Sequence, residues 1–171
     1  MGFVPNSLLT MARWPHLLRA FVPLAGLVNG PGRIAPETKA LVGFVSTRAS
    51  GCRYCQAHTS HMASRRGVSA AKLEAALEFE TSPLFDAAER AALRYARDAS
   101  LSLGAVTSAH HAELRKHFDE AQIVELTAVV ALFGFLNRWN DALATTLEPE
   151  PLAVATARLS EHGWSVDKHG A

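Results

Sequence analysis

The order of apolar and polar residues along this chain predicts helices almost throughout, and patterns typical of strands are scarce. Glycine, proline and helix-capping residues divide the chain into segments of helical length. We expect helices at residues 8–28 (one or two, divided by prolines), 36–49, 52–66, 69–79, 86–100, 107–117, 119–146 and 152–161. The sequence therefore predicts an all-α fold of about seven to nine helices in a single domain that spans residues 1–171.

Two of the expected helix boundaries rest on particular local signals. Gly51 interrupts the chain, and the hydroxyl of Ser50 before it can cap the helix expected at 52–66. Pro149 is expected to end the long helix at 119–146, because proline cannot continue a helix that precedes it.

The expected helix at 119–146 is apolar on nearly every side. Its apolar residues are Ile123, Val124, Leu126, Val129, Val130, Leu132, Phe133, Phe135 and Leu136. A helix that is apolar all round is buried, either at the centre of a domain or between subunits. In a chain of 171 residues we expect burial between subunits and hence a homo-oligomer, with a central core helix as the alternative.

Composition and charge exclude several classes of function. Hydrophobic residues make up 49% and charged residues 19% of the chain, and 17 basic residues balance 16 acidic ones. Such a balance argues against binding to nucleic acid or to a membrane surface. The first residues do not form a signal peptide, and the apolar run from Val124 to Leu136 is too short to span a bilayer. We therefore expect a cytoplasmic protein.

Both cysteines of the chain, Cys52 and Cys55, lie three residues apart, and His58 follows at the same interval. In a cytosolic protein such a pair is more typical of catalysis or metal binding than of a structural disulfide. Two sulfurs and a titratable base are the parts of a dithiol redox site, which needs neither a metal nor a further cofactor.

Helical geometry indicates which histidine can serve the cysteines. At 100° per residue, Cys55 lies at about −60° and His58 at about −120° from Cys52, whereas His61 falls on the far side of the helix from Cys52. Cys52 would lie in the first turn, where free amides and the helix dipole stabilise a thiolate, and Arg53 adds positive charge. We therefore expect His58, and not His61, to act with the sulfurs.

Two other interpretations of the cysteine pair remain open. Four ligands spread over half the circumference of one helix cannot converge on a tetrahedral zinc ion. A zinc site built from Cys52, Cys55 and a distant histidine, such as His110 or His111, is still possible. The cysteines can also be an inert buried pair.

Several segments resemble one known family. The run Gly51-Cys52-Arg53-Tyr54-Cys55-Gln56-Ala57-His58, with Val45-Ser46 before it, resembles the core of the AhpD-like alkylhydroperoxidase and carboxymuconolactone decarboxylase superfamily. The segments 2–7 and 15–18 are similar to the N-terminal region of its peroxidase-related branch, and residues 133–141 to a late helix of that branch. The resemblance covers most of the chain.

This resemblance implies an all-α fold, assembly into a homo-oligomer (trimer or hexamer) and thiol peroxidase activity on a hydroperoxide. In the family the two cysteines cycle between dithiol and disulfide, and a separate thiol reductant, which this chain does not identify, restores them. A histidine moves protons and is often supported by a glutamate on the preceding helix.

The chain departs from the family pattern at both relay positions. Thr59 occupies the usual place of the histidine, one residue after His58, and Ala40 occupies that of the glutamate. Two carboxylates are candidate substitutes, Glu125 and Glu37. Glu125 lies among apolar residues and so needs a partner, either His58 or an arginine, and it can equally belong to a structural salt bridge. Glu37 lies one turn before Ala40, where it can equally be an ordinary first-turn acid.

The leading functional hypothesis is therefore a thiol-dependent peroxidase in which Cys52 and Cys55 form a disulfide and His58 is the acid–base group. Which cysteine attacks is open, since the helix dipole favours Cys52 and proximity to His58 favours Cys55. One alternative is a lyase that acts on a small carboxylated lactone, which needs no cysteine pair. Another is a non-catalytic redox sensor.

Overall fold

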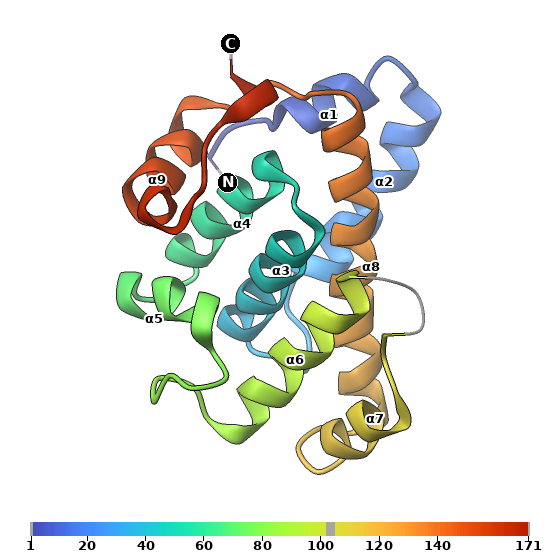
Figure 1. Cartoon of the computed structure of the whole chain (residues 1–171). Helices are drawn as coiled ribbons and strands as arrows, with labels where there is room; N and C mark the ends of the chain where they lie inside the picture. Colours follow the sequence, from blue (N-terminus) through green and yellow to red (C-terminus); the bar gives the residue numbers. More distant parts are fainter. Residues whose placement is uncertain (1, 102–104, 171) are drawn as a thin grey trace.

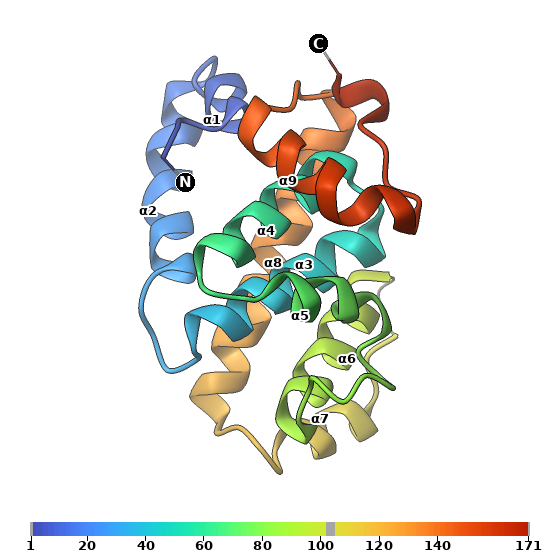
Figure 2. The same cartoon turned by 90° about the vertical axis from the view of Figure 1, so that its left-hand side faces the viewer.

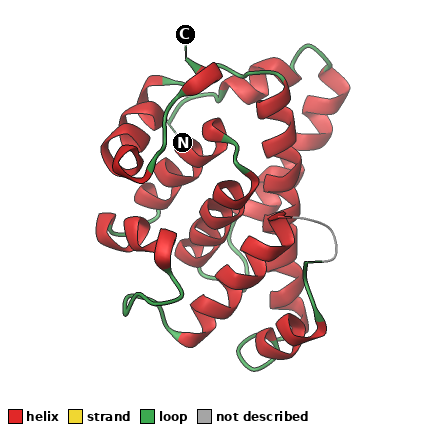
Figure 3. Ribbon diagram, in the orientation of Figure 1, coloured by secondary structure: helices red, strands yellow, loops and turns green. Residues whose placement is uncertain are grey.

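The computed structural model describes residues 2–101 and 105–170, and within these ranges the chain forms only helices and connecting loops (Figure 3). The α-helices are α1 (Asn6–Met11), α2 (Pro15–Asn29), α3 (Pro36–Ser50), α4 (Arg53–Arg65), α5 (Ala70–Ala75), α6 (Ala87–Leu101), α7 (Ser108–Leu114), α8 (Glu120–Ala142) and α9 (Pro149–Leu159). Three short 3₁₀ turns are η1 (Ala76–Glu78), η2 (Ser160–His162) and η3 (Asp167–His169). The predicted all-α fold is confirmed.

Helix α3 lies at the centre of the bundle. Figures 1 and 2 show α4, α6 and α8 around it, and it packs against all three. Every residue from Lys39 to Thr47 is buried. Gly43 allows a close approach to α8, because a Cβ atom there would lie 2.6 Å from the ring of Phe133. The helix before the cysteines is therefore the core helix, and its end fixes where α4 begins.

Helix α8 is less completely buried than its sequence predicts. Its inner face packs in the core, but Val124 is 67% and Phe135 40% exposed. Among the described residues, α8 alone is long and apolar enough to cross a membrane by length and composition, a test that a core helix also meets. The homo-oligomer stays a prediction. In such an assembly, a second copy of the chain would cover exposed apolar side chains such as Val124 and Phe135.

The structure corrects two expected helix boundaries. Gly51 ends α3 with a φ of 82°, a left-handed conformation that suits glycine, and Ser50 is the last residue of α3. The residue that caps α4 is Cys52, which replaces the expected Ser50. Pro149 begins α9, so α8 ends at Ala142 without help from proline.

A buried ion pair joins α3 to α8. Lys39, only 1% exposed, donates to the carbonyl oxygens of Val28 and Gly30 and forms an ion pair of 2.5 Å with Glu125. The second carboxylate oxygen of Glu125 accepts from the amide of Arg33. The partner of this carboxylate is thus Lys39, and neither His58 nor an arginine side chain. Glu125 is structural, in a salt bridge that holds the α2–α3 loop against α8.

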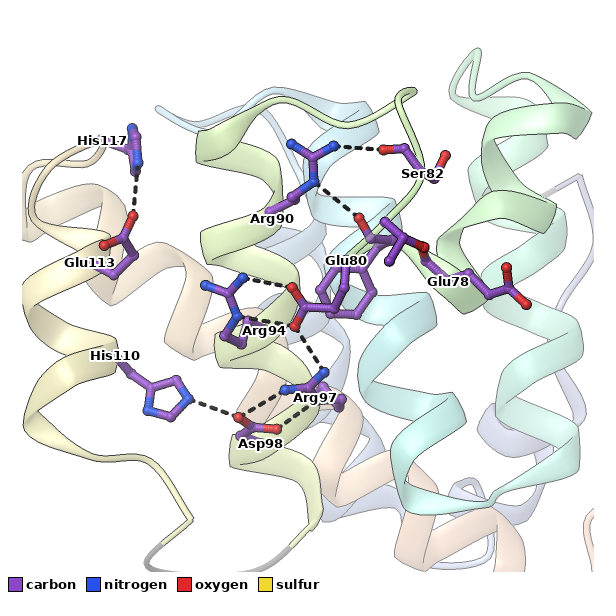
Figure 4. A network of polar contacts seen from close by, with 12 residues as sticks. Glu78, Glu80, Ser82, Arg90, Arg94, Arg97, Asp98, His110, Glu113 and His117 are labelled. Atoms are coloured by element: carbon purple, nitrogen blue, oxygen red, sulfur yellow. Dashed lines mark hydrogen bonds and ion pairs between the residues drawn. The ribbon is translucent and has the colours of Figure 1, made fainter.

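A second polar network fastens α6 to its neighbours at the end of the molecule away from α1 and α9 (Figures 1 and 4). Arg94 and Arg97 both bind Glu80, and Asp98 binds His110 of α7 at 2.8 Å. The side chain of His110 is therefore bound to Asp98 of α6. Within residues 2–101 and 105–170, no three histidine, cysteine or acidic side chains form a group that could hold a metal.

Replacement of Glu125 with leucine is expected to lower the free energy of unfolding by about 2–4 kcal/mol, because Lys39 would keep a buried charge without a counter-ion. The matched control is Glu120→Gln, which removes an exposed partner of Arg115 and should cost under about 1 kcal/mol. Urea denaturation measures both. Equal losses in the two variants would show that the Lys39–Glu125 pair does not stabilise the fold.

Candidate active site

The junction between α3 and α4 positions the two cysteines. The turn at Gly51 makes Cys52 the N-cap of α4, and its sulfur accepts a hydrogen bond from the amide of Cys55 at 3.3 Å. Both side chains are buried, and neither is in a disulfide. At this place the sulfur of Cys52 meets the free amides of a helix N-terminus.

The two thiols differ in acidity. A hydrogen bond from the Cys55 side chain lowers the pKa of Cys52, and the Cys55 amide lowers it further, which outweighs the effect of burial. Burial raises the pKa of Cys55 well above its ordinary value, and its role as donor to Cys52 adds to this. A hydrogen bond from Asn140 opposes the rise. In the reduced state Cys52 is therefore the thiol that ionises more easily.

His58 is paired with a carboxylate that the sequence analysis did not single out. Its Nε2 lies 2.6 Å from Oε2 of Glu148, the N-cap residue of α9. The other oxygen, Oε1, accepts from the hydroxyl of Tyr54 at 3.0 Å and from the amide of Asn6. The amide of Ser7 in turn donates to the Tyr54 hydroxyl. Three segments distant in sequence thus meet at one carboxylate.

The environment keeps this carboxylate ionised and the tyrosine neutral. Burial favours the neutral acid, but hydrogen bonds from His58 and from the Asn6 amide prevail, so the pKa of Glu148 lies below its ordinary value. Burial and the charge of Glu148 raise the pKa of Tyr54 well above the usual range. Because Glu148 can only accept, the Nε2 of His58 carries the proton, and its Nδ1 is left as the basic atom.

The ring of His58 is held in place by its neighbours. Tyr54 stacks on it with ring centres 4.3 Å apart, and Phe3 meets its edge at 5.9 Å. His61 is also buried, and its ring centre lies 5.9 Å from that of Phe3. With its tautomer and ring plane both fixed, His58 is prepared for proton transfer.

A cavity of about 410 Å³ opens beside these groups. Its polar wall includes Cys55, His58, Tyr54 and Asn140. Apolar side chains from α1, α2, α4 and α8 form the rest of the surface near them: Leu8, Phe21, Ala25, Met62, Phe133 and Leu136. The site is thus suited to an organic molecule with an apolar body.

Cys55 faces this cavity, and Cys52 lies behind it. The side-chain amide of Asn140 donates to the sulfur of Cys55 at 3.6 Å and to the backbone carbonyl of Leu136 at 3.0 Å. Cys52 does not line the cavity. The C-terminal segment lies over the N-terminal end of α4, where Cys52 is the N-cap. There Trp164 donates to the carbonyl of Arg53, and Arg53 donates to the carbonyl of Gly163.

The structure brings Cys52, Cys55 and His58 together on α4 and leaves both candidate carboxylates elsewhere. Glu125 is occupied by Lys39, as described above. Glu37 lies near Arg66 and Gly67, at the other end of α4. Neither is a partner of His58, because Glu148 occupies that place.

Ala40 and Thr59, which occupy the usual places of the family's glutamate and histidine, have structural contacts of their own. Ala40 is fully buried in α3. The hydroxyl of Thr59 donates to the carbonyl of Cys55 and meets that of Thr47 at 3.0 Å. One signal for Glu148 was present in the sequence: an acidic residue directly before a proline marks a helix start. Its side chain makes no capping bond to its own helix, which leaves it free for His58.

The site combines a buried dithiol at a helix N-terminus with a histidine–carboxylate pair, within an all-helical fold that matches an AhpD core. The carboxymuconolactone decarboxylase family model matches residues 15–98. The chain belongs to the carboxymuconolactone decarboxylase superfamily, and its fold is that of AhpD-like proteins.

Among solved structures, the debrominase Bmp8 in its apo form is 39% identical, with a TM-score of 0.86, over 91% of this chain and 83% of Bmp8. A cysteine-to-alanine variant of Bmp8 in complex with 2,3,4-tribromopyrrole matches equally well. A peroxidase-related protein with an AhpD core from Ralstonia eutropha, at 24% identity, has the same fold with a TM-score of 0.73, over 82% of this chain and 75% of that protein.

The uncharacterized protein YnjA of Escherichia coli is 35% identical over 108 residues, which cover 63% of this chain and 59% of YnjA.

Substitution Glu148→Gln is expected to lower stability at neutral pH by about 1–3 kcal/mol and to flatten its fall in acid. The folded pKa of Glu148 lies below the ordinary value of 4.5. The ionised group therefore adds stability that is complete above pH 4.5 and is lost as the pH falls through the folded pKa.

Urea denaturation from neutral pH down to about pH 3 measures this difference, with Glu150→Gln, an exposed acid on the same helix, as the matched control. An unchanged acid limb in Glu148→Gln would contradict the assignment of this carboxylate as an ionised, buried acceptor.

Proposed function

We propose that this protein is a dithiol oxidoreductase that reduces an organic hydroperoxide to its alcohol. The observation that carries the proposal is the combination at one cavity of a buried cysteine pair, a histidine–carboxylate pair and apolar walls. Membership of the superfamily supports an enzymatic role. The choice of a hydroperoxide rests on the chemistry of the groups.

The reaction balances with the two thiols as the only reductant. The sulfur of Cys55 attacks the distal oxygen of ROOH, the O–O bond breaks, and ROH leaves with the proton of the thiol. Cys55 is then a sulfenic acid. The sulfur of Cys52 attacks it, water is released, and the disulfide forms. A thiol of another molecule must reduce this disulfide by exchange before the next turnover.

Two observations favour Cys55 as the attacking sulfur. It lines the cavity, whereas Cys52 does not, and the amide of Asn140 can hydrogen-bond its thiolate. Burial makes that thiolate costly, so a nearby base is needed. The low pKa of Cys52 suits the second step, in which a ready thiolate resolves the sulfenic acid.

His58 is the proposed acid–base group, one helical turn after Cys55 on the same cavity wall. Its Nδ1 takes the proton of the Cys55 thiol and returns it to the leaving alkoxide. Glu148 holds Nε2–H, which fixes the tautomer and stabilises the imidazolium during the transfer. Tyr54, kept neutral, holds the carboxylate in position.

Addition of cumene hydroperoxide to the reduced protein is expected to remove two titratable thiols per chain and to yield one alcohol. Cys55→Ser should abolish the reaction. Without an added thiol, Cys52→Ser should consume only one equivalent and leave a sulfenic acid that dimedone captures. Quantification of thiols, mass spectrometry and coupled turnover with dithiothreitol provide the measurements.

Glu150→Gln is the control for handling and should behave as the wild type. Peroxidase turnover that survives in both single cysteine variants would refute the proposal. Disulfide formation without turnover, even with a small dithiol present, would favour the redox sensor. Activity on a carboxylated lactone in a protein without either cysteine would favour the lyase.

A second candidate, reductive dehalogenation, is favoured by the similarity to Bmp8, which extends over 91% of this chain. The same dithiol could replace an aryl C–Br bond by C–H, with release of bromide and a proton and formation of the same disulfide. A brominated pyrrole is the matched substrate. Release of one bromide per two thiols, at a rate that exceeds the hydroperoxide reaction, would give priority to this function.

A further inference from the structure

The cavity has a cationic end as well as a reactive one. Its wall follows α4 from Cys55 past Thr59 and Met62 to Arg65 and Arg66. Ten residues of helix separate Cys55 from Arg65, which places their backbones about 15 Å apart along the axis. The cavity is therefore an elongated groove whose two ends differ in chemistry.

The surface between the two ends is mainly apolar. Phe21 and Ala25 of α2 form one side, and Phe133 and Leu136 of α8 contribute to the other. Among the described residues that line the cavity there is no carboxylate. A negative group that entered the cationic end would thus meet no acidic side chain on the cavity wall.

The two arginines have different roles. Arg66 is committed to the fold, since it donates to the carbonyls of Asn29 and Pro36, at 2.6 and 3.4 Å, and Glu37 lies near it. Arg65 is exposed, and in the described part of the chain its side chain has neither a hydrogen-bond partner nor an ion-pair partner. Its guanidinium is thus available to a ligand.

We infer that the natural substrate is an apolar-chain carboxylic acid, whose carboxylate binds Arg65 while its reactive group lies at Cys55. The inference rests on the proposed function of the Cys55 site and specifies its substrate class. An apolar chain fills the groove between the two ends, and the guanidinium fork suits a carboxylate. A neutral substrate of equal length gains only the apolar contacts.

The test uses a stable alcohol, 12-hydroxydodecanoate, which is the product expected from the matching hydroperoxide, and its methyl ester. Isothermal titration calorimetry on the reduced full-length protein compares their affinities. The acid should bind about three- to tenfold more tightly than the ester at low salt, and the preference should shrink at high salt, because the arginine is exposed.

Arg65→Gln should remove this preference without weakening the ester, and Arg65→Lys should restore part of it. Arg13→Gln, which removes an exposed arginine outside the cavity, is the matched control and should keep the full preference. Circular dichroism checks that each variant is folded.

Equal affinities of acid and ester in the wild type, or a preference that survives in Arg65→Gln, would overturn the inference. The binding assay needs no turnover, so its result is separate from that of the peroxidase assay. If the protein prefers the acid but no hydroperoxide oxidises its thiols, the proposed function is contradicted, whereas the acid-binding site is supported.

Discussion

The site depends on one buried carboxylate. Glu148 binds His58 and Tyr54 of α4 and the amide of Asn6, so it holds the N-terminal segment and the start of α9 against the same helix. A carboxylate that is only 7% exposed is costly to ionise unless hydrogen bonds offset the loss of water. Here three donors do so, and the same bonds fix the tautomer of His58.

The two cysteines differ in acidity, and each depends on its surroundings in a different way. Cys52 has its acidity from its place at the helix N-terminus and from Cys55. Cys55 is buried at the cavity, where a thiolate is disfavoured. In the proposed reaction a neighbouring base therefore has to remove its proton.

The sequence predicts the local parts of this architecture well. Helices, several of their caps and the common helix of Cys52, Cys55 and His58 all follow from residues a few positions apart. The predicted cap at Ser50 is wrong, because α3 extends to Ser50 and ends at Gly51, and Cys52 is therefore the N-cap of α4. Such an error is small, since both residues lie at the same junction.

The relay carboxylate could not be predicted in the same way. Ninety residues separate His58 from Glu148, and their contact arises only when α9 packs on α4. Glu125, a carboxylate among apolar residues, does have a partner, but that partner is the buried Lys39 and not His58. Periodicity identifies buried polar groups, whereas tertiary packing decides which of them meet.

The most direct test of this account is the pH dependence of alkylation of Cys55 by iodoacetamide in a Cys52→Ser background, with and without Glu148→Gln. If the carboxylate makes His58 the base that serves Cys55, its loss should shift the rate profile to higher pH and slow alkylation at neutral pH. Glu150→Gln in the same background should change nothing. Superimposable profiles with and without Glu148 would contradict the central claim.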